Sequence, residues 1–287
     1  MRTLTPIPGL LLAATILPAT AFAQQPEAVP DPTVAVSRAC AAAGGLAAFK
    51  ELATFRIDMA REEVTQDGTV QKSALTFYLK APGPVPGRLE DPSVKVVAGD
   101  DGSGGWALVN GQLDARPATI VMVRRMMASN LFSALLPFSL TWDGVTVTAV
   151  TAAELDGTPT WRLKVEMGRG FFHTPQISTS WTVDLDRRTF RVLRAESPFT
   201  DLGKGITADG MRFAWSEPVR FGGVTFSGMQ RVTGLDATGR EKSHSRIDRH
   251  RFTPVPSDRL ASLFANPVPP DKRPTVPAFQ PPPRPTT

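Results

Sequence analysis

Three histidines and a few acidic residues have the types and spacing that metal or acid-base chemistry would need. His244, Asp248 and His250 lie at alternating positions of one segment, so a strand would place their imidazole and carboxylate groups on one face. Arg246 lies between them on that face, and its guanidinium group would repel a bound cation. We therefore predict a solvent-facing polar strand here and no metal site.

The sequence lacks the common signatures of hydrolases and of phosphate-binding enzymes. A nucleophile elbow would read Gly-x-Ser-x-Gly, and the chain has no such run. The glycine-rich stretch from Asp101 to Gly105 precedes no helix directly and has no lysine in P-loop register. Asp100, Asp101 and Ser103 also lack the distal glutamate of a calcium loop. The sequence therefore predicts a turn here, no cofactor and no enzymatic activity.

Cys40 is the single cysteine of the 287-residue chain, so no internal disulfide can form. Alanines at positions 39 and 41–43 surround it, which indicates a packed helix face with a buried thiol. A hydrophobic core must then supply the stability of the protein.

Residues 1–23 have the features of a secretory signal. Arg2 is followed by the apolar run from Leu10 to Leu17, and then by the small-x-small motif Ala21-Phe22-Ala23. The apolar run is too short and too often interrupted by proline to span a bilayer. We predict cleavage near Ala23 and a periplasmic or secreted mature protein.

The charge and the composition limit the partners and the domain organisation. The chain has a net charge of +5, which falls to +4 without Arg2, and its charges are spread out. A diffuse positive charge does not favour nucleic acid, although it suits a membrane surface. We expect a single domain over residues 24–253. Residues 254–287 include 11 prolines, which predicts a mostly disordered tail with a short helix at 257–264.

Alternating apolar and polar residues predict about ten consecutive antiparallel strands. In one strand Trp161 and Leu163 share a face, and Trp181 begins the same pattern in the next. An Ala-rich helix from Thr33 to Leu52 precedes the strands, and Gly44-Gly45 either kinks it or lets it lie close to a strand. This order is typical of a mainly β meander.

The segment from Gly99 to Leu140 interrupts the strands. Asp101-Gly102 and Asn110-Gly111 predict two-residue turns on either side of a short strand at Trp106 to Val109. A helix is then predicted from Ala118 to Phe138. Its apolar stripe comprises Val121, Met122, Met126, Leu131, Leu135 and Phe138, with Arg124, Arg125 and Asn130 off the stripe. Such a helix either packs into an ordinary core or covers a cavity.

The order of several short motifs resembles the periplasmic lipoprotein-carrier superfamily, the LolA/LolB-like proteins. The motifs are Gly44-Gly45-x3-Phe49, Leu79-Lys80-Ala81-Pro82, Arg88-Leu89-Glu90, the Gly99-Asp100-Asp101-Gly102 turn leading to Trp106, Glu154-Leu155-Asp156-Gly157 before Trp161-Arg162-Leu163, and Trp181-Thr182-Val183-Asp184 before Arg187-Arg188-Thr189. They cover about residues 33–253. The resemblance implies an open, curved antiparallel half-barrel, with an N-terminal helix and the internal apolar helix across its concave face.

A one-sided sheet that curves without closing must bury its apolar face under helices, and a cover that moves exposes a groove. We therefore expect a monomeric carrier or binding protein for a lipid, an acyl chain or a lipid-modified protein. The residues expected to line the groove and its cover are Trp106, Val121, Met122, Met126, Leu131, Leu135, Trp161, Leu163 and Trp181. The alternative is a cell-envelope sensor or assembly module that binds a protein partner with the same fold.

Overall fold

The computed structural model describes residues 28–65, 67–102, 104–168, 179–197 and 209–273. The predicted signal at residues 1–23 lies outside these ranges. Within them, no helix is both long and apolar enough to cross a membrane.

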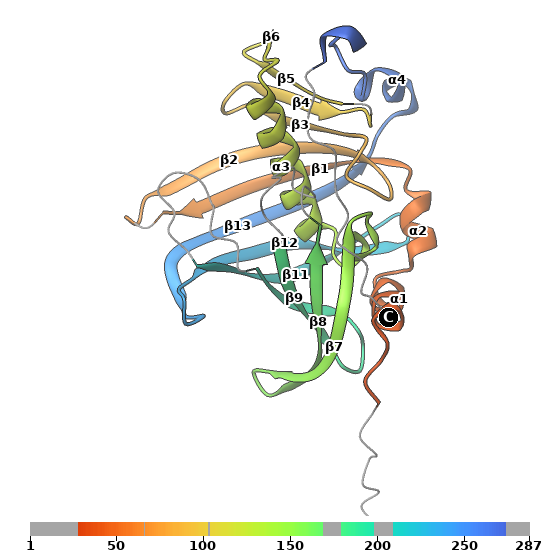
Figure 1. Ribbon diagram of the computed structural model, residues 1–287, viewed down its shortest axis with the longest axis vertical. Helices are drawn as coiled ribbons and strands as arrows, with labels where there is room; N and C mark the ends of the chain where they lie inside the picture. Colours follow the sequence, from red (N-terminus) through yellow and green to blue (C-terminus); the bar gives the residue numbers. More distant parts are fainter. Residues whose placement is uncertain (1–27, 66, 103, 169–178, 198–208, 274–287) are drawn as a thin grey trace, which may run out of the picture.

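Thirteen strands form one open antiparallel sheet within the described residues (Figure 1). The strands are β1 (Thr54–Val64), β2 (Val70–Lys80), β3 (Gly87–Asp91), β4 (Val96–Asp100), β5 (Gly105–Val109), β6 (Gln112–Leu113), β7 (Val145–Leu155), β8 (Thr158–Met167), β9 (Thr179–Asp186), β10 (Val192–Ser197), β11 (Gly210–Phe221), β12 (Val224–Leu235) and β13 (Glu241–Pro254). The sheet order is β6-β5-β4-β3-β2-β1-β13-β12-β11-β10-β9-β8-β7. The predicted mainly β, curved and open architecture is therefore confirmed.

The strand count of thirteen exceeds the predicted number of about ten, mainly because two edge strands, β6 and β7, were not recognised. β6 has only two residues, and β7 consists of small and β-branched residues with little polar contrast. The two-residue turn predicted at Asn110-Gly111 is present, with both residues at positive φ. At Asp101-Gly102 that prediction is wrong, because Asp100 pairs with Gly105 and leaves a loop of four residues.

The first helix is interrupted at Gly44-Gly45, as predicted. It forms α1 (Pro32–Ala42) and α2 (Leu46–Glu51), with Asp31 accepting a hydrogen bond from the backbone N–H of Thr33 at the start of α1. Gly44 has a φ of +109°, and a Cβ atom there would lie 2.5 Å from the carbonyl oxygen of Gly223. The glycine therefore serves both suggested purposes, since it bends the chain and allows close contact with the β11–β12 turn.

The central helix α3 (Pro117–Ala134) connects the two open edges of the sheet, because it follows β6 and leads to β7. A chain that joins opposite edges of a sheet must cross one of its two faces, and Figure 1 shows α3 lying across the concave one. The helix ends four residues earlier than predicted. Pro137 disfavours the helical conformation of the preceding residue, and the short 3-10 helix η1 (Phe138–Thr141) follows.

The buried face of α3 differs from the predicted stripe in its first half. Ile120, Val123 and Met127 are buried, whereas Met122 has 53% of its surface exposed. Arg124 was expected off the buried face, yet it forms a buried ion pair with Asp100 of β4. Four consecutive apolar residues at 120–123 allow two rotations of the helix, and this ion pair selects one of them.

The first part of the predicted disordered tail is folded. Residues 257–259 (η2), 260–263 (α4) and 270–272 (η3) form short helical turns, and Val268 is 2% exposed. The guanidinium group of Arg88 donates to the carbonyl oxygen of Leu263 at 3.4 Å, and Asn266 donates to that of Gly104 at 3.1 Å. The tail thus lies against β3 and the β4–β5 loop as far as residue 273, and residues 274–287 lie outside the described ranges.

Candidate functional site

The concave face has an aromatic end, formed where α2, η1 and the strands β1, β12 and β13 meet. Phe49 and Phe138 stack with ring centroids 4.4 Å apart, and Phe226 and Phe252 stack at 4.3 Å. Phe55 packs against Phe226 at 6.1 Å. The alternation of strand side chains places one aromatic ring from each strand on this side.

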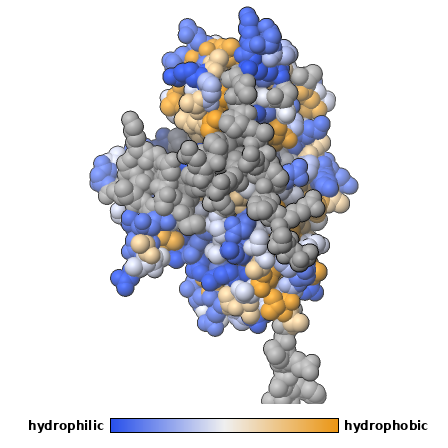
Figure 2. All heavy atoms as spheres, viewed as in Figure 1, coloured by the Kyte–Doolittle hydropathy of each residue, from blue (hydrophilic) through white to orange (hydrophobic). Residues whose placement is uncertain are grey.

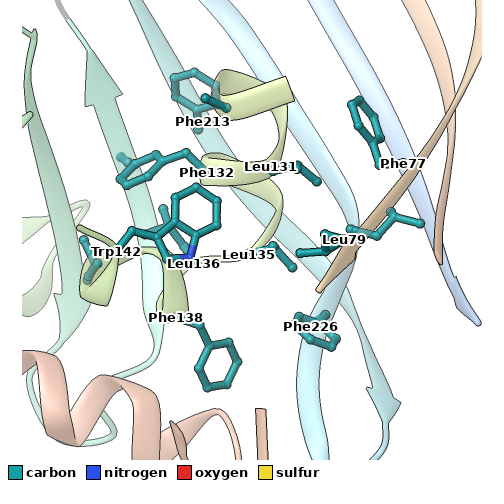
Figure 3. Packing of buried hydrophobic residues seen from close by; sticks show 14 of the residues in the cluster. Phe77, Leu79, Leu131, Phe132, Leu135, Leu136, Phe138, Trp142, Phe213 and Phe226 are labelled. Carbon is teal, nitrogen blue, oxygen red and sulfur yellow. The ribbon is translucent and has the colours of Figure 1, made fainter. Parts of the chain in front are cut away.

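Side chains of α3 fill the space above the middle of the sheet. Figure 3 shows Leu131 and Leu135 on the side of the helix toward Phe77 and Leu79. Phe132, on another side of the helix, meets Trp181 edge-on at 5.0 Å. Each such buried side chain contributes about 1.5–3 kcal/mol to stability relative to an exposed one.

Two buried indole groups of this face have no hydrogen-bond acceptor in the described part of the chain. These are the Nε1–H groups of Trp161 on β8 and Trp181 on β9, whose side chains are 0% and 4% exposed. A buried donor without a partner is costly, and most proteins avoid it. An acceptor oxygen supplied by a bound molecule would satisfy either group.

A cluster of charged side chains lies farther along the same face. Asp248 of β13 accepts from Nε of Arg61 at 2.8 Å and forms an ion pair with Nε of Arg246 at 2.9 Å. Arg61 also donates to the side-chain oxygen of Asn130 on α3 at 2.6 Å. The prediction of a solvent-facing strand is therefore wrong, because this face of β13 is turned toward α3 and His244 is only 2% exposed.

Burial and charge shift the pKa values in this cluster. Burial alone would raise the pKa of Asp248, but the adjacent guanidinium groups of Arg246 and Arg61 more than offset it and hold that pKa below the usual range. Burial lowers the pKa of His250, which is therefore neutral at pH 7. Its Nδ1 lies 3.2 Å from the carbonyl oxygen of Ser227, which fits a protonated Nδ1 that donates.

Only a few polar contacts attach the second half of α3 to the sheet. Besides the bond between Arg61 and Asn130, Trp215 Nε1 donates to the carbonyl oxygen of Ser133 at 3.1 Å, and Gln230 donates to the hydroxyl of Ser133 at 3.2 Å. The remaining contacts are largely apolar and could be exchanged for those of another apolar molecule.

The structure brings together some of the predicted groove residues and separates others. Those that belong to the core cluster of the concave face, or pack against its edge, are Leu131, Leu135, Trp161, Leu163, Trp181 and the half-buried Met126. Val121 and the exposed Met122 are outside that cluster.

Trp106 lies on the opposite face of the sheet. A Cβ atom at Gly105 would lie 2.7 Å from Ile120 of α3, so Gly105 faces the helix and its neighbour Trp106 faces away. There the indole packs beneath Arg88, whose guanidinium carbon is 5.7 Å from the ring centroid. Trp106 therefore does not share a space with Trp161 and Trp181.

Sequence reasoning missed Phe132, Phe213 and the contacts of Asn130. The sequence does hold a signal that could have identified Phe132. This residue follows Leu131 in a helix that is apolar on more than one side. No sequence signal indicated the bond between Asn130 and Arg61, since the two residues are far apart in sequence.

The space left on the concave side is small. A pocket of about 100 Å³ lies between α1, the Leu136–Pro137 turn and β10–β12, and Trp215 and Phe226 are among its walls. Pockets for small molecules usually measure about 300–1,000 Å³, so a long acyl chain would need α3 to move.

Metal-binding or nucleophilic residues could form another kind of site. Within the described ranges, however, no group of three His, Cys, Asp or Glu side chains could hold a metal ion. Cys40 is buried, as predicted, and burial raises the pKa of its thiol to about 11. The thiol is therefore protonated and a poor nucleophile at neutral pH.

The fold is similar to that of solved LolA-like proteins. A LolA superfamily protein from Nitrosomonas europaea matches 80% of this chain and 97% of its own, with 10% identity and a TM-score of 0.52. A DUF1329 family protein from Desulfovibrio piger covers 82% of this chain and 100% of its own, with 12% identity and a TM-score of 0.48. An outer membrane lipoprotein-sorting protein domain from Vibrio parahaemolyticus covers 82% of this chain and 99% of its own, with 9% identity and a TM-score of 0.47.

Neither a protein-family model nor a curated protein sequence matches the chain. Identities this low show the fold alone. The chain therefore has a LolA-like fold, in which an open curved sheet holds an apolar helix across its concave face.

Proposed function

We propose that the protein is an exported carrier or binding protein that holds a lipid, an acyl chain or a lipid-modified protein against the concave face of its sheet. The observation that carries this proposal is α3, an apolar helix that covers the face while attached to both edges of the sheet. Its buried side chains occupy a surface that could instead bind an acyl chain. Burial there would contribute about 0.8 kcal/mol of binding free energy for each methylene.

Binding then consists of an exchange. The acyl chain takes the place of Leu131 and Leu135 beside Phe77 and Leu79, and of Phe132 beside Trp181. The helix α3 then moves outward while its connections to β6 and β7 stay in place. The exchange costs the contacts of α3, so the ligand must bind the open state more tightly than the helix does. The unpaired indole N–H groups of Trp161 and Trp181 are then available to ester or carboxyl oxygens of the ligand.

Fluorescence quenching by a brominated fatty acid tests the location of the ligand, because bromine quenches an indole only at close range. We expect quenching in the wild-type protein and the loss of a large part of it in Trp181→Phe. Trp106→Phe is the matched control, because both indoles are buried and they lie on opposite faces of the sheet. Native mass spectrometry of protein purified without detergent should also detect bound lipid.

Equal loss of quenching in the two variants would place the ligand elsewhere than on the concave face. The absence of both quenching and co-purified lipid would contradict the carrier proposal and favour the alternative, a sensor or assembly module. That alternative is then tested by pull-down from envelope extract, comparing the full chain with one that ends at Arg273, which keeps the folded segment after β13.

A further inference from the structure

A basic depression lies on the surface between α1 and the turn that joins β9 to β10. It encloses about 710 Å³ of open space, and Arg38, Arg187, Arg188 and Phe190 are among its walls. Asp186 supplies the one carboxylate among the described residues that line it. Three guanidinium groups thus face one carboxylate.

That carboxylate is already engaged by its own turn. The Oδ1 atom of Asp186 accepts from the backbone N–H of Thr189 at 2.6 Å and from the hydroxyl of Thr189 at 2.7 Å. None of the three arginines forms an ion pair with a carboxylate in the described part of the chain. Asp186 offsets one of the three positive charges, and the depression therefore keeps a net positive charge.

Aromatic rings hold two of these guanidinium groups in place. The Cζ atom of Arg38 is 4.7 Å from the ring centroid of Phe190, and that of Arg187 is 4.5 Å from the ring centroid of Trp161. Stacking on a ring leaves the N–H groups at the guanidinium edge free to donate, and this edge fits the oxygens of a phosphate group.

Apolar surface adjoins the basic depression. Ala42 of α1 lines both the depression and the 100 Å³ pocket, and Arg191 lines the pocket together with the core residues Leu136 and Phe226. Val34 of α1 is 47% exposed. Figure 2 shows hydrophobic atoms at the lower end of the molecule, in the region where Figure 1 places α1. Arginines next to exposed apolar groups are the combination that an anionic bilayer surface attracts.

We propose that Arg38, Arg187 and Arg188 of the basic depression, together with the neighbouring Arg191, bind the phosphate groups of an anionic phospholipid bilayer. These contacts dock the protein on the bilayer surface. Docking in this orientation places the small apolar pocket next to the lipid. The proposal does not rest on acyl-chain binding, because attachment to vesicles is measured directly.

Co-sedimentation with vesicles tests the proposal. The vesicles contain phosphatidylcholine alone, or phosphatidylcholine mixed with phosphatidylglycerol. We expect binding only to the mixed vesicles, with release at high salt. Each basic residue near such a surface strengthens binding about fivefold, so the double variant Arg38→Gln/Arg188→Gln should bind at least tenfold more weakly.

The matched control is Arg231→Gln/Arg249→Gln. It removes the same charge from two exposed arginines whose strand positions place them on the face turned away from α3. This control should bind as the wild type does. Equal loss in both double variants would show a net-charge effect and overturn the site, and so would a failure of the wild type to bind mixed vesicles at low salt. If inorganic phosphate binds the protein but the mixed vesicles do not, the depression is a small-anion site and the docking proposal is wrong.

Discussion

At the scale of single residues, His250 makes stability depend on pH. Burial holds its pKa below the ordinary 6.5, so between the two values the unfolded chain binds a proton that the folded chain does not. The contribution of His250 to the free energy of unfolding is full above about pH 6.5 and is lost as the pH falls toward the folded pKa, by at most about 1.4 kcal/mol per pH unit. We expect His250→Gln to show a smaller loss than the wild type between pH 7.5 and 5.5 in urea unfolding. Identical slopes for the two proteins would refute a neutral, buried imidazole.

At the scale of elements, the rotation of α3 decides which methionines matter. Met127 is 2% exposed and faces the sheet near Gly87, whereas Met122 is 53% exposed. Met127→Lys would bury an unpaired ammonium group and should lower the free energy of unfolding by about 3 kcal/mol or more, while Met122→Lys should change it by less than about 0.5 kcal/mol. Urea unfolding of both variants measures the difference. A larger loss of stability in Met122→Lys than in Met127→Lys would mean that α3 has the rotation predicted by the sequence stripe and not the one in the structure.

At the scale of the whole molecule, the chain after β13 packs against β3 and the β4–β5 loop. Leu263 and Val268 of this segment are buried, and Arg88, which bonds to the carbonyl oxygen of Leu263, lies over the ring of Trp106. Leu263→Ala/Val268→Ala should lower the free energy of unfolding by about 3 kcal/mol, from lost burial and the cavities left behind, and make Trp106 more accessible to acrylamide. Val94→Ala, at a position with 58% exposure, is the control and should have no measurable effect. If the double variant has the same free energy of unfolding as the wild type, these two residues do not stabilise the sheet.

Local pattern in the sequence was sufficient for the class of fold. The alternation around Trp161 and Trp181 requires one-sided strands, and Gly44-Gly45 requires a break in the first helix, because both depend only on neighbouring residues. The buried Cys40 and the apolar helix before β7 were predicted on the same basis. The signal at residues 1–23 and the boundaries of the domain remain predictions.

The tertiary structure decided which face each residue serves. Trp106 was predicted to line the same groove as Trp161, yet it lies on the other side of the sheet, since the face is set by the contact of Gly105 with α3. His244, Asp248 and His250 of β13 were predicted to face solvent, and they are buried because α3 crosses above this face of the strand and Asn130 reaches Arg61. Alternation separates the two faces of a strand, but only the path of the chain between the sheet edges determines which face α3 covers.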